Sequence, residues 1–347
     1  MNRDQTRPDR GTRFLIPLLV VLGLTSLYPT FYSLYMSLFD WNWGQRFNFV
    51  GLANYAELLT SERFQIALWN TFVFTIGAVV VELVIGIGLA LVVNRLGRGA
   101  AVVRTLLLVP LMVSGIIVAL IWKIILDPTI GPLNLVLRQL GLPVLGFLGD
   151  PGMGMASVIL IDVWWQTAFV FIVFSAGLQA LPREPLEAAE VDGAGFWARL
   201  RYVILPMLRP IILVILLFRT IDCMKVFAII FGTTGGGPLT TTESVQVLAY
   251  RIAFKQQGMS MSMAAMVIFA AVVLALVIAL RRANREPLPW TRIHAGSPVV
   301  LSPASGSQND GLRGVVSDRK RVIIEVAFPH LPDEEEVTRW RLDLASD

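Results

Sequence analysis

Three ionisable side chains lie close together in a stretch of sequence that is otherwise strongly apolar. Arg219, Asp222 and Lys225 are spaced three residues apart, so on a helix each lies beside the next. A charged side chain at the centre of a lipid bilayer costs about 2.5–3.5 kcal/mol, and it therefore needs an ionic partner or a water-filled cavity. Two interpretations stay open, and both can hold: an internal ion-pair network that joins helices, or a polar wall along a solute route.

A second polar group interrupts another apolar stretch and comprises Asp162, Trp164, Trp165 and Gln166. Aromatic faces bind the C–H patches of sugars, and carboxylates and amides bind their hydroxyl groups, so this composition suits a sugar route. Alternatively, the indole rings pack between helices and Asp162 bonds to a neighbouring helix. Because adjacent residues point in different directions on a helix, we expect the Trp pair mainly to pack, with one able to face a pore. Glu82, isolated among valines and leucines, is expected to form a structural ion pair.

Residue types suited to catalysis or metal binding are scarce in this chain. Cys223 is the only cysteine, and the two histidines, His294 and His330, lie near the C-terminus. The sequence contains no G-x-x-x-x-G-K-[ST] phosphate loop. We therefore predict no catalytic residues, no metal site and no cofactor bound by this chain. Any energy from ATP would have to come through another subunit.

Long apolar segments must position these side chains. The 347 residues are 55% hydrophobic and only 16% charged, and apolar blocks of about 20 residues cross a bilayer as helices. Their unbroken runs lack the alternating pattern of a membrane barrel. We predict an all-α integral membrane protein with six transmembrane helices, at Phe14–Leu38, Ile66–Val93, Leu106–Leu126, Met153–Leu178, Ile211–Phe231 and Met259–Leu280.

The distribution of Lys and Arg indicates how the chain is oriented. Arginines are frequent in the N-terminal segment, in the loops at 94–105 and 179–209, and after residue 280, whereas the opposite side holds few basic residues. The positive-inside rule then places both termini and the 179–209 loop in the cytoplasm. The net charge of +4 reflects this topology and gives no reason to expect nucleic-acid binding.

These spans divide the chain into four parts. We expect a cytoplasmic N-terminal tail over 1–13, a first transmembrane helix with an external segment over 14–65, a transmembrane core over 66–282, and a cytoplasmic tail over 283–347. In the last part, prolines with Ser and Gly indicate a linker, and Arg321–Phe328 could form one strand. Disorder and docking on a partner are both open for this tail, to which we assign no function.

The loop at 179–209 carries an order of residues that a simple connector does not require. Glu187-Ala188-Ala189 falls in the first turns of an expected helix, where acidic groups favour the positive end of the helix dipole. Asp192-Gly193-Ala194 allows the chain to bend, and a second helix over about 196–204 is expected to end near Leu205-Pro206. The alternative interpretation is an amphipathic connector at the membrane surface.

This loop resembles the EAA loop by which the membrane subunits of binding-protein-dependent ABC importers contact their ATPases. Val203 stands where isoleucine is more usual in that loop. Other segments resemble the carbohydrate-type permeases of the maltose-like, type I class. Together with the loop they cover about residues 14–282, and they are Phe49–Tyr55, Trp69–Thr71, Phe218–Asp222 and Thr234–Pro238.

The resemblance implies a type I ABC importer permease fold in the bacterial cytoplasmic membrane. The chain would form half of the translocation pathway for a sugar or related polyol. Its implied partners are a second homologous permease, two ATPase subunits that bind the ATP and Mg²⁺, an extracytoplasmic substrate-binding protein, membrane lipid and a sugar-like small molecule. The residues implied in ATPase coupling are Glu187, Ala188, Ala189, Asp192, Gly193, Ala194, Leu205 and Pro206.

Two other functions are compatible with a membrane protein of this length. A self-contained secondary transporter or channel should carry inverted repeats with paired broken helices, and the two halves of this sequence show no such symmetry. A membrane anchor for a cytoplasmic complex leaves the charges around Arg219 unexplained. Within the importer hypothesis, the solute stays open among disaccharide, oligosaccharide, polyol and glycerol phosphate.

Overall fold

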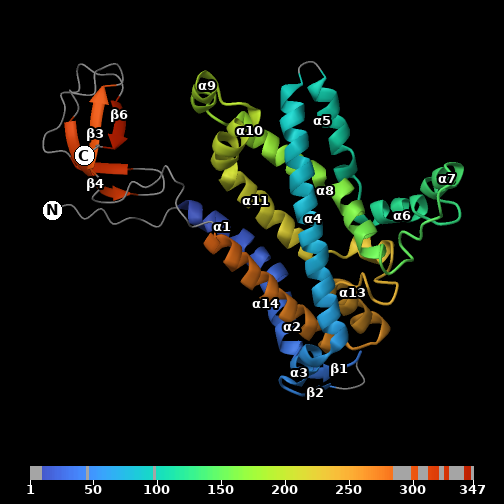
Figure 1. Cartoon of the computed structure of the whole chain (residues 1–347). Coiled ribbons are helices and arrows are strands. Elements are labelled where there is room, and N and C mark those ends of the chain that lie inside the picture. Colours follow the sequence, from blue (N-terminus) through green and yellow to red (C-terminus); the bar gives the residue numbers. More distant parts are fainter. Residues whose placement is uncertain are drawn as a thin grey trace, which may run out of the picture. The chain divides into compact units, whose positions relative to one another are not determined.

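Membrane-length helices dominate the computed structural model, which describes residues 10–43, 47–96 and 99–283 and four strands of the C-terminal part (Figure 1). Within these residues, five helices are long and apolar enough to cross a membrane, and a sixth span results if one bent helix pair is counted as one. The chain separates into two compact units, residues 1–281 and 282–347. The helical prediction is therefore confirmed, with two spans that differ in detail.

The first apolar segment runs through α1 (Arg10–Leu22), a π-helical turn (Gly23–Leu27) and α2 (Tyr28–Met36). None of its membrane-length window is buried in the structure, so this helix presents its side chains to its surroundings. A short hairpin of β1 (Phe39–Trp41) and β2 (Phe47–Phe49) follows, and then α3 (Ala53–Thr60). Asn54 joins these pieces because its amide nitrogen donates to the carbonyl oxygens of Ser37 and Phe39, both at 2.8 Å.

The centre of the helical unit is the pair α4 (Glu62–Arg95) and α8 (Gly154–Gln179), which pack along their length. Their contact depends on small residues. A Cβ atom added at Gly86 would lie 2.6 Å from the Val170 side chain, and one at Gly77 would lie 2.8 Å from Ile159. Glycine thus lets the two backbones approach, as in other close helix pairs. Gly88 lies away from this contact, because nothing lies within 4 Å of its Cβ position.

The third predicted span, Leu106–Leu126, is not one straight helix. It consists of α5 (Ala100–Leu108), a 3₁₀ turn (Pro110–Met112) and α6 (Gly115–Ile125), with a bend of 98° between its two arms. Pro110 cannot donate a backbone hydrogen bond, and Val113 and Ser114 are extended. The Trp165 indole nitrogen donates to the Val113 carbonyl oxygen at 3.1 Å and so satisfies a backbone group that the break exposes. Beyond α6 lies α7 (Pro132–Gln139).

The fifth predicted span, Ile211–Phe231, is also placed differently. From α10 (Phe196–Arg199) the chain stays helical through a π-helical turn (Leu200–Ile204) into α11 (Leu205–Met224) and then leaves the helix. The second helix of the 179–209 loop therefore does not end near Leu205-Pro206. The π-helical turn just before Pro206 already departs from i→i−4 bonding, so the missing N–H of the proline does not stop the helix.

The remaining helical elements close the unit. After α11 come α12 (Ala228–Gly232), α13 (Val245–Tyr250), a π-helical turn (Arg251–Lys255) and α14 (Met259–Ala283), while α9 (Glu184–Val191) precedes α10. Figure 1 shows α9 and α10 at one end of the helical unit and α3, the β1–β2 hairpin and α13 at the other. The second unit holds one antiparallel sheet in the order β5-β4-β3-β6. Its strands are β3 (Pro298–Pro303), β4 (Leu312–Arg319), β5 (Ile324–Ala327) and β6 (Trp340–Leu344), where the sequence predicted one strand.

The contact at Gly86 yields the first prediction. Gly86→Ala should destabilise the protein by about 1–3 kcal/mol, because the new methyl group has no room beside Val170. The matched variant Gly88→Ala adds a methyl group into open space and should leave stability unchanged or raised. Thermal unfolding of the purified protein in detergent measures both. Equal loss of stability in the two variants would show that the α4–α8 contact does not require glycine.

Candidate functional site

Arg219 joins three helices of the core through its guanidinium group. It donates from Nε to Glu82 Oε2 at 2.6 Å and from Nη2 to Glu82 Oε1 at 2.8 Å, a bidentate pair between α11 and α4. The same Nη2 donates to Asp162 on α8 at 2.9 Å, and Nη1 donates to Asp222 at 2.5 Å. Arg219 and Glu82 are almost fully buried, so the ionic partners that the sequence required are supplied by this cluster.

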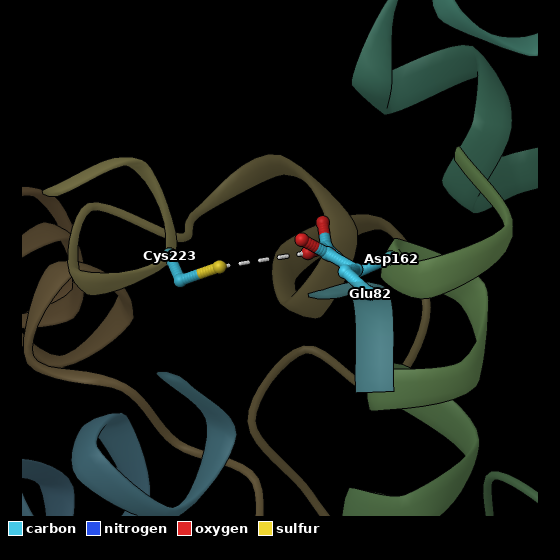
Figure 2. A group of neighbouring side chains, drawn as sticks. All are labelled: Glu82, Asp162 and Cys223. Atoms are coloured by element: carbon cyan, nitrogen blue, oxygen red, sulfur yellow. Dashed lines mark hydrogen bonds between the residues drawn. The ribbon is translucent and has the colours of Figure 1, made fainter. Parts of the chain in front are cut away.

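The donor atoms of this cluster also match a metal-binding arrangement in composition. Glu82, Asp162 and Cys223 each offer a ligand atom, and these atoms lie within 4.8 Å of one another (Figure 2). However, the Arg219 guanidinium already bonds both carboxylates and lies 3.2 Å from the Cys223 sulfur. The guanidinium group of Arg219 therefore occupies the position that a metal ion would need. We call the cluster of Arg219, Glu82, Asp162 and Asp222 the ion-pair joint.

Two cavities lie beside this joint. The first, of about 370 Å³, is lined by Gln166, Phe169, Phe218, Arg219, Ile221, Asp222 and Lys225. The second, of about 280 Å³, is lined by Asp162, Trp165, Gln166, Asp222, Cys223, Lys225 and the residues 226–229. Gln166, Asp222 and Lys225 line both cavities. The polar residues of two different predicted spans therefore meet at one place in the fold.

The environment of Lys225 differs from the one that the sequence predicted. The sequence placed it beside Asp222 on a continuing helix, but α11 ends at Met224, so the helical spacing of three no longer applies. Among the described residues Lys225 forms no ion pair within 4.0 Å, while Asp222 pairs with Arg219 and keeps 58% of its side chain exposed. The cavities thus receive an ammonium group and a carboxylate from neighbouring positions. Arg219 lies in the last two turns of this helix rather than in the middle of a span.

The two tryptophans separate, as adjacent residues on a helix must. Trp165 lines the second cavity and bonds to Val113, whereas Trp164 lies on the other side of α8. Trp164 packs edge-to-face against Trp122, with ring centres 5.5 Å apart, and lines a different, apolar cavity of about 420 Å³. Trp164 is therefore not part of the predicted polar route. Phe169 and Phe218 line the first cavity and were missed by the sequence analysis, although they lie one turn from Gln166 and Asp222.

The 179–209 loop forms a second candidate site at the other end of α8. Glu187 lies in the first turn of α9, exposed with Ala188, and Asp192 ends that helix. Gly193 has φ +76°, a left-handed conformation that favours glycine, and nothing lies within 4 Å of its Cβ position. The predicted bend is confirmed at this residue. Leu205 and Pro206 lie away from the bend, inside the continuous helix.

One contact holds the bend against α4, and a second joins the two helices of the loop to each other. The Arg95 guanidinium at the end of α4 lies over the Phe196 ring, 3.9 Å from its centre, and Arg199 pairs with Glu190 at 3.0 Å. Three hydrophobic side chains of the loop do not pack into the protein: Val191, Trp197 and Tyr202 are 88%, 76% and 73% exposed. Exposed apolar side chains around a fixed bend are typical of a protein-binding surface.

The ion-pair joint yields the second prediction. Arg219→Met should remove most folded protein, because it leaves Glu82 and Asp162 buried without a counter-charge, at a cost of about 3–5 kcal/mol. Asp222→Asn should cost at most about 1 kcal/mol, since that carboxylate is largely exposed. The yield of monodisperse protein and its thermal midpoint measure both changes. A larger loss in Asp222→Asn than in Arg219→Met would contradict the assignment of Arg219 as the joint.

Known proteins resemble the helical part of the chain. Residues 82–285 match the family described as "Binding-protein-dependent transport system inner membrane component". The chain is 35% identical to the trehalose/maltose transport system permease protein MalF of Thermococcus litoralis, over 69% of this chain and 82% of that protein. It is 31% identical to the sn-glycerol-3-phosphate transport system permease protein UgpA of Agrobacterium fabrum, over 78% of this chain and 93% of that protein.

A solved structure shares the fold of the helical unit. A chain in the crystal structure of a bacterial ABC transporter involved in the import of the acidic polysaccharide alginate matches with a TM-score of 0.71 and 25% identity. The match covers 79% of this chain and 94% of that chain. The family match spans more than half of the sequence and includes the ion-pair joint, both cavities and the bend at Gly193. The chain therefore belongs to the family of inner membrane components of binding-protein-dependent transport systems, as a permease subunit of an ABC importer and not as an enzyme.

Proposed function

We propose that this permease carries a sugar or a related polyol, and that the two cavities beside Arg219 belong to the solute route. The observation that carries the proposal is their shared lining. Gln166, Asp222 and Lys225 offer an amide, a carboxylate and an ammonium group, and the rings of Phe169 and Phe218 stand beside them. Polyhydroxylated solutes need both kinds of contact, because their hydroxyl groups hydrogen-bond while their C–H patches lie on aromatic faces.

The relatives support the same solute class. Their names include transport of trehalose or maltose and of sn-glycerol 3-phosphate, which are all polyhydroxylated molecules. A self-contained secondary transporter or channel is not favoured, since the family works with other subunits. The ion-pair joint has a supporting role in this proposal. It satisfies the buried charges of Glu82, Asp162 and Arg219 within the protein, so that the charged groups that the described cavity linings offer to a solute are Lys225 and the exposed side of Asp222.

We also propose that the 179–209 loop docks on the ATPase. The exposed acidic start of α9, the bend at Gly193 and the exposed Trp197 support this role, since they form a fixed, partly apolar surface. In this arrangement two ATPase subunits bind the ATP and Mg²⁺, a second homologous permease completes the pathway, and an extracytoplasmic protein delivers the solute. Both termini of the chain then lie in the cytoplasm, on the side of the loop, in agreement with the positive-inside rule.

The solute route yields the third prediction. The assay uses proteoliposomes that contain the complete importer and its binding protein. Gln166→Leu and Lys225→Met should each lower solute uptake by about tenfold, because each leaves a hydroxyl group of the solute without a hydrogen-bond partner in the cavity. Trehalose, maltose and glycerol 3-phosphate are the probes. The matched control Trp164→Phe changes the same helix on its other side and should transport normally. Normal uptake of whichever probe the wild type carries, in both variants, would remove the cavities from the route.

The docking loop yields the fourth prediction. Gly193→Ala places a side chain on a residue with a left-handed conformation, which should destabilise the bend by about 1–2 kcal/mol. We expect the ATPase no longer to co-purify with this variant. Gly195→Ala is the matched control, because Gly195 has φ −65° and open space around its Cβ position. Glu187→Lys should also weaken ATPase binding, because it reverses the charge at the start of α9. Normal ATPase yield in Gly193→Ala and Glu187→Lys would refute the docking role.

A further inference from the structure

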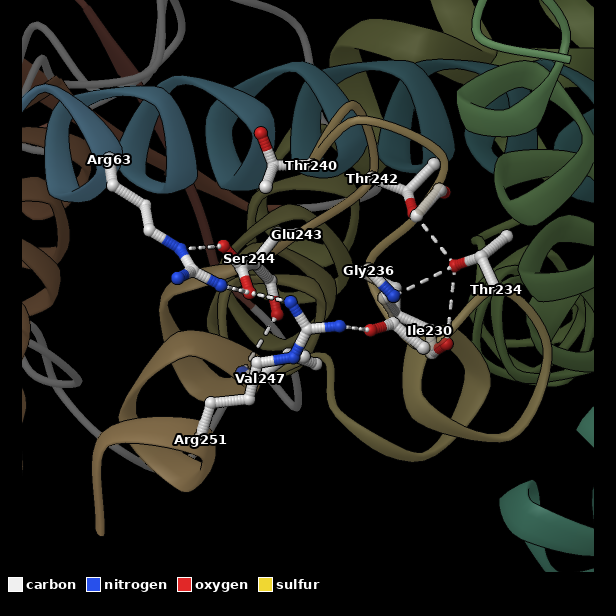
Figure 3. Close-up of polar contacts among 12 residues, drawn as sticks. Arg63, Ile230, Thr234, Gly236, Thr240, Thr242, Glu243, Ser244, Val247 and Arg251 are labelled. Atoms are coloured by element: carbon white, nitrogen blue, oxygen red, sulfur yellow. Dashed lines mark hydrogen bonds and ion pairs between the residues drawn. The ribbon is translucent and has the colours of Figure 1, made fainter. Parts of the chain in front are cut away.

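A buried carboxylate at the opposite end of the helical unit from α9 holds two arginines. Glu243 is fully buried, and Arg63 on α4 donates to it from Nε at 2.8 Å and from Nη2 at 2.9 Å (Figure 3). Arg251, from the turn after α13, donates from Nη1 to the same carboxylate at 2.7 Å. A carboxylate with three charge-assisted hydrogen bonds is a rigid connection between the elements that supply its partners. The solute and docking sites described above do not use it.

These arginines fasten the loop at 233–244 to the helices around it. Arg251 also donates from Nη2 to the Gly235 carbonyl oxygen at 2.5 Å, so it bonds to Gly235 near the start of the loop and to Glu243 near its end. Asn70 on α4 donates to the carbonyl oxygens of Thr240 and Glu243, at 2.8 and 3.2 Å. The loop is therefore bonded to α4 at two levels, by the side chains of Arg63 and Asn70.

The conformation of this loop needs such support. Leu239 and Thr240 have φ +49° and +63°, a left-handed region that side chains other than glycine rarely adopt. Internal hydrogen bonds reinforce it, including one of 2.7 Å between the hydroxyl groups of Thr234 and Thr242. Strained residues of this kind persist only where the surroundings over-determine them. The Glu243 connection is a substantial part of that surrounding structure.

The residue after Glu243 connects the loop to the cavities. Ser244 is fully buried, and its hydroxyl group donates to the Val226 carbonyl oxygen at 3.0 Å while accepting from the Val247 backbone N–H at 3.4 Å. Val226 lies in the non-helical segment after α11 and lines the second cavity beside Lys225. Its carbonyl oxygen is thus satisfied by the loop, which helps to define where the helix stops.

We infer that Glu243 is a positioning residue, which through Ser244 and Val226 fixes the interrupted end of α11 where Asp222 and Lys225 face the cavities. The importance of this position for transport rests on the proposed solute route. The positioning itself does not, because it is a statement about the structure of residues 222–227. Loosening the Glu243 connection should let this segment move away from α8 and expose the residues it now covers.

Cys223, the only cysteine of the chain, is a native reporter for that movement. It lies within this segment, is 2% exposed and lines the second cavity. The experiment treats the complete importer with N-ethylmaleimide and follows modification of the Cys223 peptide by mass spectrometry. The variants are Glu243→Gln, which removes the charge that holds both arginines, and Ser244→Ala, which leaves the arginines in place and removes the bond to Val226 together with the weaker one from the Val247 N–H. The control is Arg138→Gln, on α7, which removes the bond that the Arg138 guanidinium donates to the Pro128 carbonyl oxygen.

The expected result is a rise in the Cys223 labelling rate of about tenfold in both test variants and no change in Arg138→Gln. Assembly of Ser244→Ala should stay normal, and if Glu243→Gln does not assemble, Ser244→Ala alone decides. Unchanged labelling in Ser244→Ala overturns the inference whatever Glu243→Gln shows. The outcome is independent of the solute experiments, since labelling requires no transported molecule. Loss of uptake in Gln166→Leu with unchanged Cys223 labelling in Ser244→Ala would support the route and reject the positioning role.

Discussion

The neutralisation of buried charge around Arg219 is the interaction on which the rest of the core depends. One guanidinium group bonds carboxylates from α4, α8 and α11, so three helices that are far apart in the sequence share one electrostatic centre. Such a cluster is costly to desolvate and strongly destabilising if one partner is lost. It therefore specifies which faces of these helices meet. Apolar packing alone, which dominates the α4–α8 contact, is much less selective about rotation and register.

Polar interactions at helix ends build the cavities next to this centre. Trp165 bonds to Val113 at the break between α5 and α6, and Ser244 bonds to Val226 at the end of α11. Each bond satisfies a backbone carbonyl group that an unbroken helix would have paired internally. Interrupted helices at membrane depth are tolerated where the freed backbone lies inside protein or beside a wet cavity. The breaks are thus part of the machinery that brings polar side chains to the proposed solute route.

The two ends of the helical unit use different kinds of connection. At one end, Arg95 stacks on Phe196 and holds a bend whose apolar residues remain exposed, as the proposed docking surface requires. At the other end, Glu243 holds two arginines and a strained loop, with its carboxylate fully buried. An exposed cation–π contact contributes only about 0.5–1 kcal/mol, whereas buried charge-assisted bonds are much stronger. The contact that holds the proposed docking loop to α4 is therefore weaker than the bonds that hold the loop at 233–244 to the core.

The sequence alone predicted the membrane helices, the bend at Gly193 and the need for an ionic partner near Arg219, because these follow from local properties. Apolar length, the backbone freedom of glycine and the cost of a charge in lipid are all readable from neighbouring residues. It predicted a structural ion pair for Glu82 and different directions for the two tryptophans, but not that Glu82 pairs with Arg219 or that Trp164 is the one that turns away from the cavities. Nor did it predict that α11 ends at Met224 or that Glu243 holds Arg63. Those outcomes were decided by contacts between residues 137 and 180 positions apart for the two ion pairs, and by packing at helix breaks. No local pattern encodes which distant side chain will fill a given position, so only the tertiary structure could decide them.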